Sequence, residues 1–169
     1  GNRTYWFACI NTPKMRDPRM EAYTVADLTA CFKDYHTPIP QLLALTTDKN
    51  LLWNDIEDIQ PLQQLAFNRI LLAGDAGHAT TPNMGQGGAQ AIEDAYYLSN
   101  VIADNKDENV FELFQQKRQK KVDLVVNQSW TTGKIAHWKY GQSIRNFILK
   151  NVPKSIINKK MIELYQLEK

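Results

Sequence analysis

A glycine-rich stretch that directly follows a short apolar run limits, more than any other feature, how this chain can fold. The run Arg69–Ala73 (RILLA) has the composition of a strand that is buried on both faces. It continues into Gly74 and Asp75, and then into a loop rich in Gly, Pro, Thr and Asn. Apolar residues at helical spacing follow and predict a helix over about Gly88–Ala103. The order of strand, loop and helix is typical of an α/β unit whose loop meets a ligand.

The loop residues have the chemistry of a site for a polyol and an electron-rich ring. Gly74 lets backbone approach a ligand closely, and the Asp75 carboxylate at a strand's end can accept hydrogen bonds from ribityl or ribose hydroxyls. The segment Gly85–Gly88 presents backbone N–H groups at the positive end of the helix dipole. Such an end would stabilise the anionic N1 and C2 edge of reduced flavin by roughly 0.3–2 kcal/mol. Pro82 would stiffen the loop over the ring.

These glycines are not those of a pyrophosphate-binding fingerprint. The segment Gly85–Gly87 begins like GxGxxG, but the sixth position is Gln90. The glycines also come well after the predicted strand, whereas the fingerprint follows its strand directly. The pyrophosphate loop of a dinucleotide site is therefore not expected in this chain.

The stretch GDAGHATTPNMGQGGAQAIEDAYYL resembles the second FAD-binding motif of the para-hydroxybenzoate hydroxylase family, the class A FAD-dependent monooxygenases. The family pattern is close to GDAxHxxxPxxGQGxNxxxxDA. The segment PNMGQGG is similar to the salicylate-hydroxylase-like and zeaxanthin-epoxidase-like branches. Weaker similarity covers WNDIEDIQPL before the motif and FQQKRQKK and SWTTGKIAHW after it, so the resemblance extends over most of the chain.

The resemblance implies roles for the first half of the motif. Asp75 matches the aspartate that binds the flavin ribityl chain, and Gly74 matches its glycine partner. Pro82 matches the proline near the isoalloxazine ring. Gly77 stands where alanine is usual, a change that we expect to be harmless.

The second half of the motif matches the loop whose backbone meets the pyrimidine edge of the flavin. Its cofactor-binding residues are Gly85, Gln86, Gly87 and Gly88. The next residue, Ala89, is assigned to the same site but stands where Asn is commoner. A side-chain contact to the ring would thus be lost, whereas a backbone contact could persist.

The same resemblance implies the fold class and the organisation of the chain. We expect an α/β fold, as an α+β fragment of a para-hydroxybenzoate hydroxylase-like FAD-binding fold. Residues 1–62 would be a remnant of the substrate domain, with strands and a helix. Residues 63–106 would form the second half of the FAD-binding domain, and residues 107–169 the long C-terminal helices. The family's GxGxxG half, which binds the ADP part of FAD, would lie outside this fragment, so the fragment alone is expected to be inactive.

The function implied for the parent protein is FAD-dependent monooxygenation. NADH or NADPH would reduce the flavin, and a flavin C4a-hydroperoxide would then transfer one oxygen atom of O2 to a small hydrophobic substrate, aromatic or polyene. No catalytic residue and no metal are expected in this chain, because the flavin carries the chemistry. The alternatives are a related FAD-dependent oxidoreductase or halogenase, or an inactive fragment that acts as an interaction module.

Some polar residues near the motif have competing interpretations. Trp53, Asn54 and Asp55 lie on a predicted strand and are candidates for the substrate pocket, although alternation toward a core explains them nearly as well. His78 fits a structural loop histidine better than a catalytic base. Arg118 is a candidate for an ion pair on the long helix.

Apolar spacing and turn residues predict the remaining elements. Gly133 and Gly141 are expected to interrupt the helical region after the long helix. The predicted elements are a strand at Thr4–Asn11, a helix at Ala22–Tyr35, a short helix at Pro40–Leu45, a strand at Leu51–Ile59 and a long helix at Val110–Trp130.

The charge of the chain is unevenly spread. The net charge is +2, but the chain from Val110 onward holds 12 Lys and Arg against 4 Asp and Glu. A solvated helix face explains this excess better than a site for nucleic acid or an anionic membrane. We therefore expect neither a nucleic-acid partner nor an integral membrane segment. Cys9 and Cys31 form no CxxC motif and are expected to be buried free thiols of a cytoplasmic protein.

Overall fold

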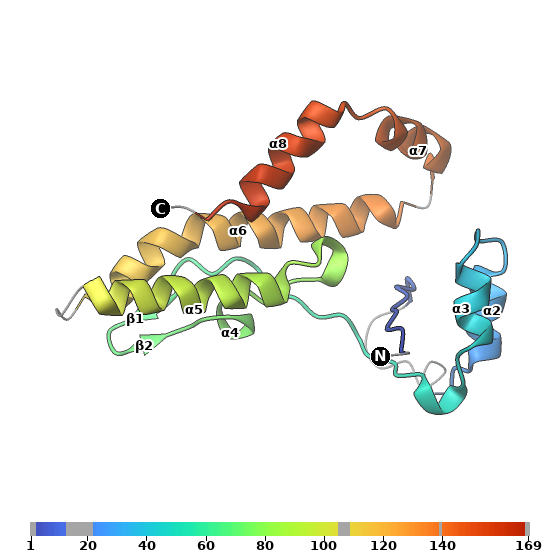
Figure 1. Cartoon of the computed structure of the whole chain (residues 1–169), viewed down its shortest axis with the longest axis horizontal. Coiled ribbons are helices and arrows are strands. Elements are labelled where there is room, and N and C mark those ends of the chain that lie inside the picture. Colours follow the sequence, from blue (N-terminus) through green and yellow to red (C-terminus); the bar gives the residue numbers. More distant parts are fainter. Residues whose placement is uncertain (1–2, 13–21, 105–108, 139, 168–169) are drawn as a thin grey trace. The chain divides into compact units, whose positions relative to one another are not determined.

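A computed structural model describes residues 3–12, 22–104, 109–138 and 140–167 of the 169-residue chain. The chain divides into two compact units, Gly1–Asp55 and Ile56–Lys169 (Figure 1). The functional division predicted at positions 62 and 106 stays a prediction. None of the helices in the described ranges has the length and apolar character needed to cross a membrane.

The first unit contains short helices. They are α2 (Val25–Phe32), α3 (Ile39–Ala44) and the 3-10 helix η1 (Asp48–Asn50). A capping box starts α2: the Asp27 carboxylate accepts from the Thr24 N–H at 2.9 Å, and the Thr24 hydroxyl accepts from the Asp27 N–H at 3.3 Å. Leu28 of α2 and Leu43 of α3 are buried and form the small apolar centre of this unit.

The strands predicted at Thr4–Asn11 and Leu51–Ile59 are wrong, because neither segment has strand structure in its described residues. Aromatic and β-branched composition favours a strand only where a neighbouring strand takes up the backbone hydrogen bonds. No such neighbour exists among the described residues of this unit, and Tyr5 remains 88% exposed. The expected burial of both thiols is also wrong, since Cys31 is exposed and Cys9 is only partly buried.

The second unit is a helical assembly with one small hairpin (Figure 1). The strands β1 (Ala66–Phe67) and β2 (Ile70–Leu71) pair antiparallel. The helical elements are α4 (Asp75–His78), η2 (Pro82–Met84), α5 (Gly87–Asp104), α6 (Val110–Ala136), α7 (Gln142–Lys150) and α8 (Lys154–Tyr165).

The predicted fold class is confirmed: helices dominate and a small sheet precedes the glycine-rich loop. The run Arg69–Ala73 does form a strand, but not one that is buried on both faces. Ile70 is 62% exposed, because among the described residues β2 pairs only with β1 and no helix covers its outer side.

The core of the second unit lies between the hairpin, α5 and α6. Its central residues are buried: Leu65 just before β1, Tyr97 of α5, and Phe114 and Val122 of α6. Phe114 is fully buried, and burial of such a side chain contributes roughly 1.5–3 kcal/mol. This core fixes α5 against α6, so that the loop between β2 and α5 starts and ends on anchored elements.

Gly133 lies inside α6 instead of interrupting the helical region, so α6 is longer than predicted. A Cβ at this position would collide with the side-chain amide of Asn83 from η2. The Asn83 amide donates to the Ser129 carbonyl at 3.3 Å and to the Thr81 hydroxyl at 2.8 Å. The glycine therefore allows the loop that contains η2 to pack closely on α6.

Gly77 of α4 packs closely against the backbone that follows β2. A Cβ there would lie 2.9 Å from the Leu72 carbonyl oxygen and 3.1 Å from Leu65 Cδ2. Gly77→Ala should therefore lower the free energy of unfolding by about 1–3 kcal/mol, as overpacking does. Urea denaturation measures this change.

Gly88→Ala is the matched control, because nothing lies within 4 Å of a Cβ at that position. Alanine favours helix over glycine, so Gly88→Ala should be neutral or slightly stabilising. Equal stability losses in the two variants would contradict the packing of Gly77.

Candidate functional site

The candidate site begins where the hairpin ends and α4 starts. Gly74 caps α4 with φ 56° and ψ −142°, a conformation that glycine adopts without strain. Asp75, the first residue of α4, is exposed. Within the described ranges its carboxylate has no hydrogen-bond or ion-pair partner, so it is available to accept hydrogen bonds from a ligand.

The second part of the site is the turn that leads into α5. Pro82 opens η2, and Gly85 closes it in the left-handed conformation with φ 63°. Gln86 is buried beside the turn, and α5 begins at Gly87. The first N–H groups of a helix have no intrahelical acceptor, and the open space around Gly88 leaves this helix end accessible to a ligand.

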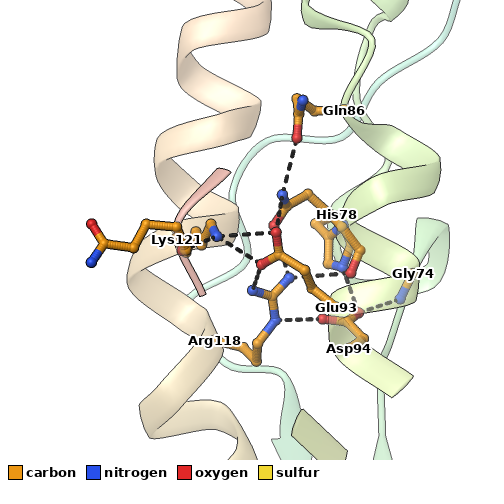
Figure 2. A network of polar contacts seen from close by, with 9 residues as sticks. Gly74, His78, Gln86, Glu93, Asp94, Arg118 and Lys121 are labelled. Carbon is orange, nitrogen blue, oxygen red and sulfur yellow. Dashed lines mark hydrogen bonds and ion pairs between the residues drawn. The ribbon is translucent and has the colours of Figure 1, made fainter. Parts of the chain in front are cut away.

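A buried carboxylate, Asp94, connects the elements around this turn (Figure 2). Its Oδ2 accepts from the Gly74 N–H at 2.8 Å and lies 2.7 Å from His78 Nε2. Its Oδ1 accepts from Arg118 Nε at 2.7 Å. Asp94 of α5 therefore binds the end of the hairpin, α4 and α6 at the same time.

The network extends from Arg118 toward the turn (Figure 2). The Arg118 guanidinium donates to the Glu93 carboxylate at 2.9 Å and to the Gln90 side-chain oxygen at 2.8 Å. The Gln90 amide in turn donates to Gln86 at 3.3 Å. Lys121 completes the network by pairing with Glu93 at 2.8 Å. A continuous set of hydrogen bonds thus runs from Arg118 of α6 to Gln86, the residue that directly precedes α5.

The charges in this network are almost completely removed from water. Arg118 is fully buried, Asp94 is 3% exposed, and the Tyr97 ring lies 5.4 Å from the guanidinium carbon. Burial is the largest influence on the pKa of Asp94 and raises it. Hydrogen bonds from His78, Gly74 and Arg118 together outweigh burial and hold this pKa below its usual value of 3.8.

His78 is buried at 3% exposure, with its ring nitrogen against Asp94. This position supports the structural interpretation of His78 over a role as a base. Arg118 does form ion pairs, as expected. Its partners are Glu93 and Asp94 of α5, so the pairs join α6 to α5. No group of three or more His, Cys, Asp or Glu residues in the described part of the chain could hold a metal ion.

Local sequence patterns do not predict this network, because Glu93 and Asp94 lie about 25 residues from Arg118 in the chain. The sequence does contain a signal for it. Arg118 falls between Phe114 and Val122 on the apolar stripe of the long helix, where a charge needs a buried partner. An acidic pair on the preceding amphipathic helix is the natural candidate for that partner.

The proposed substrate residues lie at the end of the first unit. Trp53 is partly buried, whereas Asn54 and Asp55 are exposed. The cofactor candidates Gly74 to Ala89 all belong to the second unit. The assignment of the three residues to a substrate pocket stays a prediction.

Known proteins match this chain over most of its length. Residues 3–129 match a protein family described as FAD binding domain. The aurachin C monooxygenase/isomerase of Stigmatella aurantiaca is 36% identical over 138 residues, which cover 81% of this chain and 36% of that protein. The chloroplastic zeaxanthin epoxidase of Nicotiana plumbaginifolia is 36% identical over 101 residues, which cover 59% of this chain and 15% of that protein.

A solved structure has the same fold. The Klebsiella pneumoniae HpxO complex with FAD and uric acid superposes with a TM-score of 0.73 at 30% identity, covering 83% of this chain and 37% of that one. The chain therefore spans about a third or less of the length of these proteins.

The lowered pKa of Asp94 has a consequence for acid stability. Because the folded carboxyl binds a proton more weakly than the unfolded one, its stabilising contribution is present above about pH 4 and is lost as the pH falls further. Asp94→Asn should lower the free energy of unfolding at pH 7 by about 3–5 kcal/mol, since it leaves Arg118 without its anionic partner. It should also flatten the loss of stability below about pH 4. Urea midpoints measured across this pH range check both effects.

Asp75→Asn is the control for the loss of stability at pH 7, because the Asp75 carboxylate is exposed and unpaired among the described residues. Its free energy of unfolding at pH 7 should be close to that of the unaltered chain. Parallel profiles for Asp94→Asn and the unaltered chain would contradict the role of Asp94.

Proposed function

Because this chain belongs to the FAD binding domain family, we propose that it supplies the ribityl and isoalloxazine half of the FAD site of a monooxygenase. The observation that carries this proposal is the pairing of an unpartnered carboxylate, Asp75, with the accessible N-terminus of α5. One group accepts hydrogen bonds and the other donates them, as a ribityl chain and an electron-rich ring edge require.

The residues present fit a flavin on structural grounds. A Cβ at Gly85 or Gly88 would meet nothing within 4 Å, so the backbone there is open to close approach. The buried Thr80 hydroxyl has no partner among the described residues, and its methyl group lies against the Gly87 position. An open backbone and an unused hydroxyl beside it are compatible with a bound polar ring.

Within this site the chain's own residues would position the cofactor. Asp75 would hold the ribityl hydroxyls, and the N–H groups at Gly87, Gly88 and Ala89 would stabilise negative charge on the pyrimidine edge. Pro82 and Gln86 would fix the path of the loop. When bound, the flavin would supply the redox and oxygen chemistry, with NADH or NADPH as the source of electrons.

The whole protein would insert one oxygen atom of O2 into a small hydrophobic substrate, aromatic or polyene. The resemblance to class A monooxygenases and the names of the relatives support this substrate class, which includes zeaxanthin in one relative's name. A related FAD-dependent oxidoreductase or halogenase is the second candidate, because it could use a similar flavin motif.

A half-site for the ring and ribityl chain should not depend on the ADP part of the cofactor. We expect the chain to bind riboflavin and FAD with similar affinity, measured by quenching of flavin fluorescence. Asp75→Ala should weaken both by about 10- to 100-fold, the value of hydrogen bonds to a charged group. Asp104→Ala, at the exposed far end of α5, should change neither. Much tighter binding of FAD than riboflavin, or equal effects of the two substitutions, would contradict the half-site.

Isotope labelling tests the reaction of the whole protein, in a polypeptide that joins this chain to a GxGxxG half. Under labelled O2 with NADH or NADPH, one labelled oxygen atom should enter an aromatic or polyene substrate. Halogenated product in the presence of halide, or oxidised product without label, would favour the second candidate.

A further inference from the structure

Helix α7 presents an apolar face that the fold does not use. Ile144, Phe147 and Ile148 lie on one side of this helix and are 67%, 69% and 56% exposed. No residue of α7 is buried. Its polar side includes Arg145, which donates to the Ile135 carbonyl at 3.2 Å and so attaches α7 to the end of α6. The apolar face points away from the protein's own core.

The surroundings of α7 add further exposed apolar and aromatic side chains. At the C-terminal end of α6 and just beyond it, Trp130 and Trp138 are each 50% exposed and Tyr140 is 88% exposed. Helix α8 is attached through its one buried residue, Leu164. The remaining apolar residues of α8 are about half exposed: Ile156, Ile157, Met161, Ile162 and Tyr165.

The same segment carries most of the excess positive charge. Trp130–Tyr165 contains seven basic side chains and one acidic one, Glu163. Lys150 ends α7 and Lys154 begins α8, and both are exposed. The Lys134 ammonium lies 3.4 Å from the centre of the Trp130 ring. A solvated helix face explains the charges but not the exposed isoleucine and phenylalanine side chains beside them.

We propose that Trp130–Tyr165 is an interfacial anchor that docks on an anionic lipid surface, with α7 lying in the plane of the membrane. Amphipathic helices that bind this way combine an apolar face, Lys and Arg on the polar side, and aromatic residues at the level of the headgroups. Nucleic acid would use the charges and leave the apolar face of α7 in water. A protein interface would be poor in lysine at its centre.

This anchor does not depend on the proposed flavin chemistry, and its test contains no flavin. The chain is incubated with vesicles of phosphatidylcholine alone or of phosphatidylcholine with phosphatidylglycerol, and sedimented. We expect binding to the anionic vesicles only, with a blue shift of tryptophan emission. Raising the salt concentration should weaken binding, because it screens the attraction between lysines and headgroups.

Two isoleucines of equal exposure provide a matched pair of variants. Ile148 on α7 is 56% exposed and Ile102 on α5 is 55% exposed. Ile148→Glu should weaken vesicle binding by at least about tenfold, because it removes a side chain that the lipid would bury. Ile102→Glu should leave binding unchanged. Replacement of Lys150 by Gln should weaken binding by about fivefold, and circular dichroism verifies that each variant is folded.

Three results would overturn the anchor. The first is the absence of sedimentation with anionic vesicles, and the second is equal effects of Ile148→Glu and Ile102→Glu. The third is a different occupant of the face. Self-association of the chain that Ile148→Glu abolishes, without vesicle binding, would identify a second copy. Binding to duplex DNA that Ile148→Glu leaves intact, again without vesicle binding, would identify nucleic acid.

Discussion

The ion pair between Arg118 and Asp94 is the interaction on which the arrangement of the second unit depends. Both groups lie out of contact with water, so each requires the other and a full set of hydrogen bonds. The pair meets this requirement only when α6, α5, α4 and the end of β2 are all in place, because Asp94 also accepts from Gly74 and contacts His78. A charge buried at the junction of four elements therefore favours one arrangement of them over others.

This arrangement separates two roles within one motif. The motif contains an aspartate near each end, and the two differ in their exposure to solvent. Asp75 is exposed and has no partner in the described ranges, whereas Asp94 is buried and takes part in three hydrogen bonds. The first is free for a ligand, and the second holds the loop that presents the first. Hydrogen bonds from Arg118 to Gln90 and from Gln90 to Gln86 likewise hold the turn before α5 in place.

Two other faces of the second unit carry exposed apolar residues, and their charge distinguishes them. The outer side of α5 exposes Ile92, Tyr96 and Ile102 on a helix with no Lys or Arg. The segment Trp130–Tyr165 places its apolar residues among seven basic ones. Hydrophobicity alone would treat the two faces alike, whereas an anionic surface would bind only the second.

The sequence by itself determined the features that depend on near neighbours in the chain. Helical periodicity located α5 and most of α6, and the glycine-rich motif identified the family. It did not determine the strands at Thr4–Asn11 and Leu51–Ile59, because a strand exists only with a partner that local composition does not supply. Nor did it determine that Glu93 and Asp94 face Arg118, about 25 residues away. The packing of the Asn83 side chain against Gly133 was likewise not determined by the sequence. Only the packing of α5 and η2 against α6 decided these contacts, since burial of a charge and close approach of backbone depend on which surfaces meet.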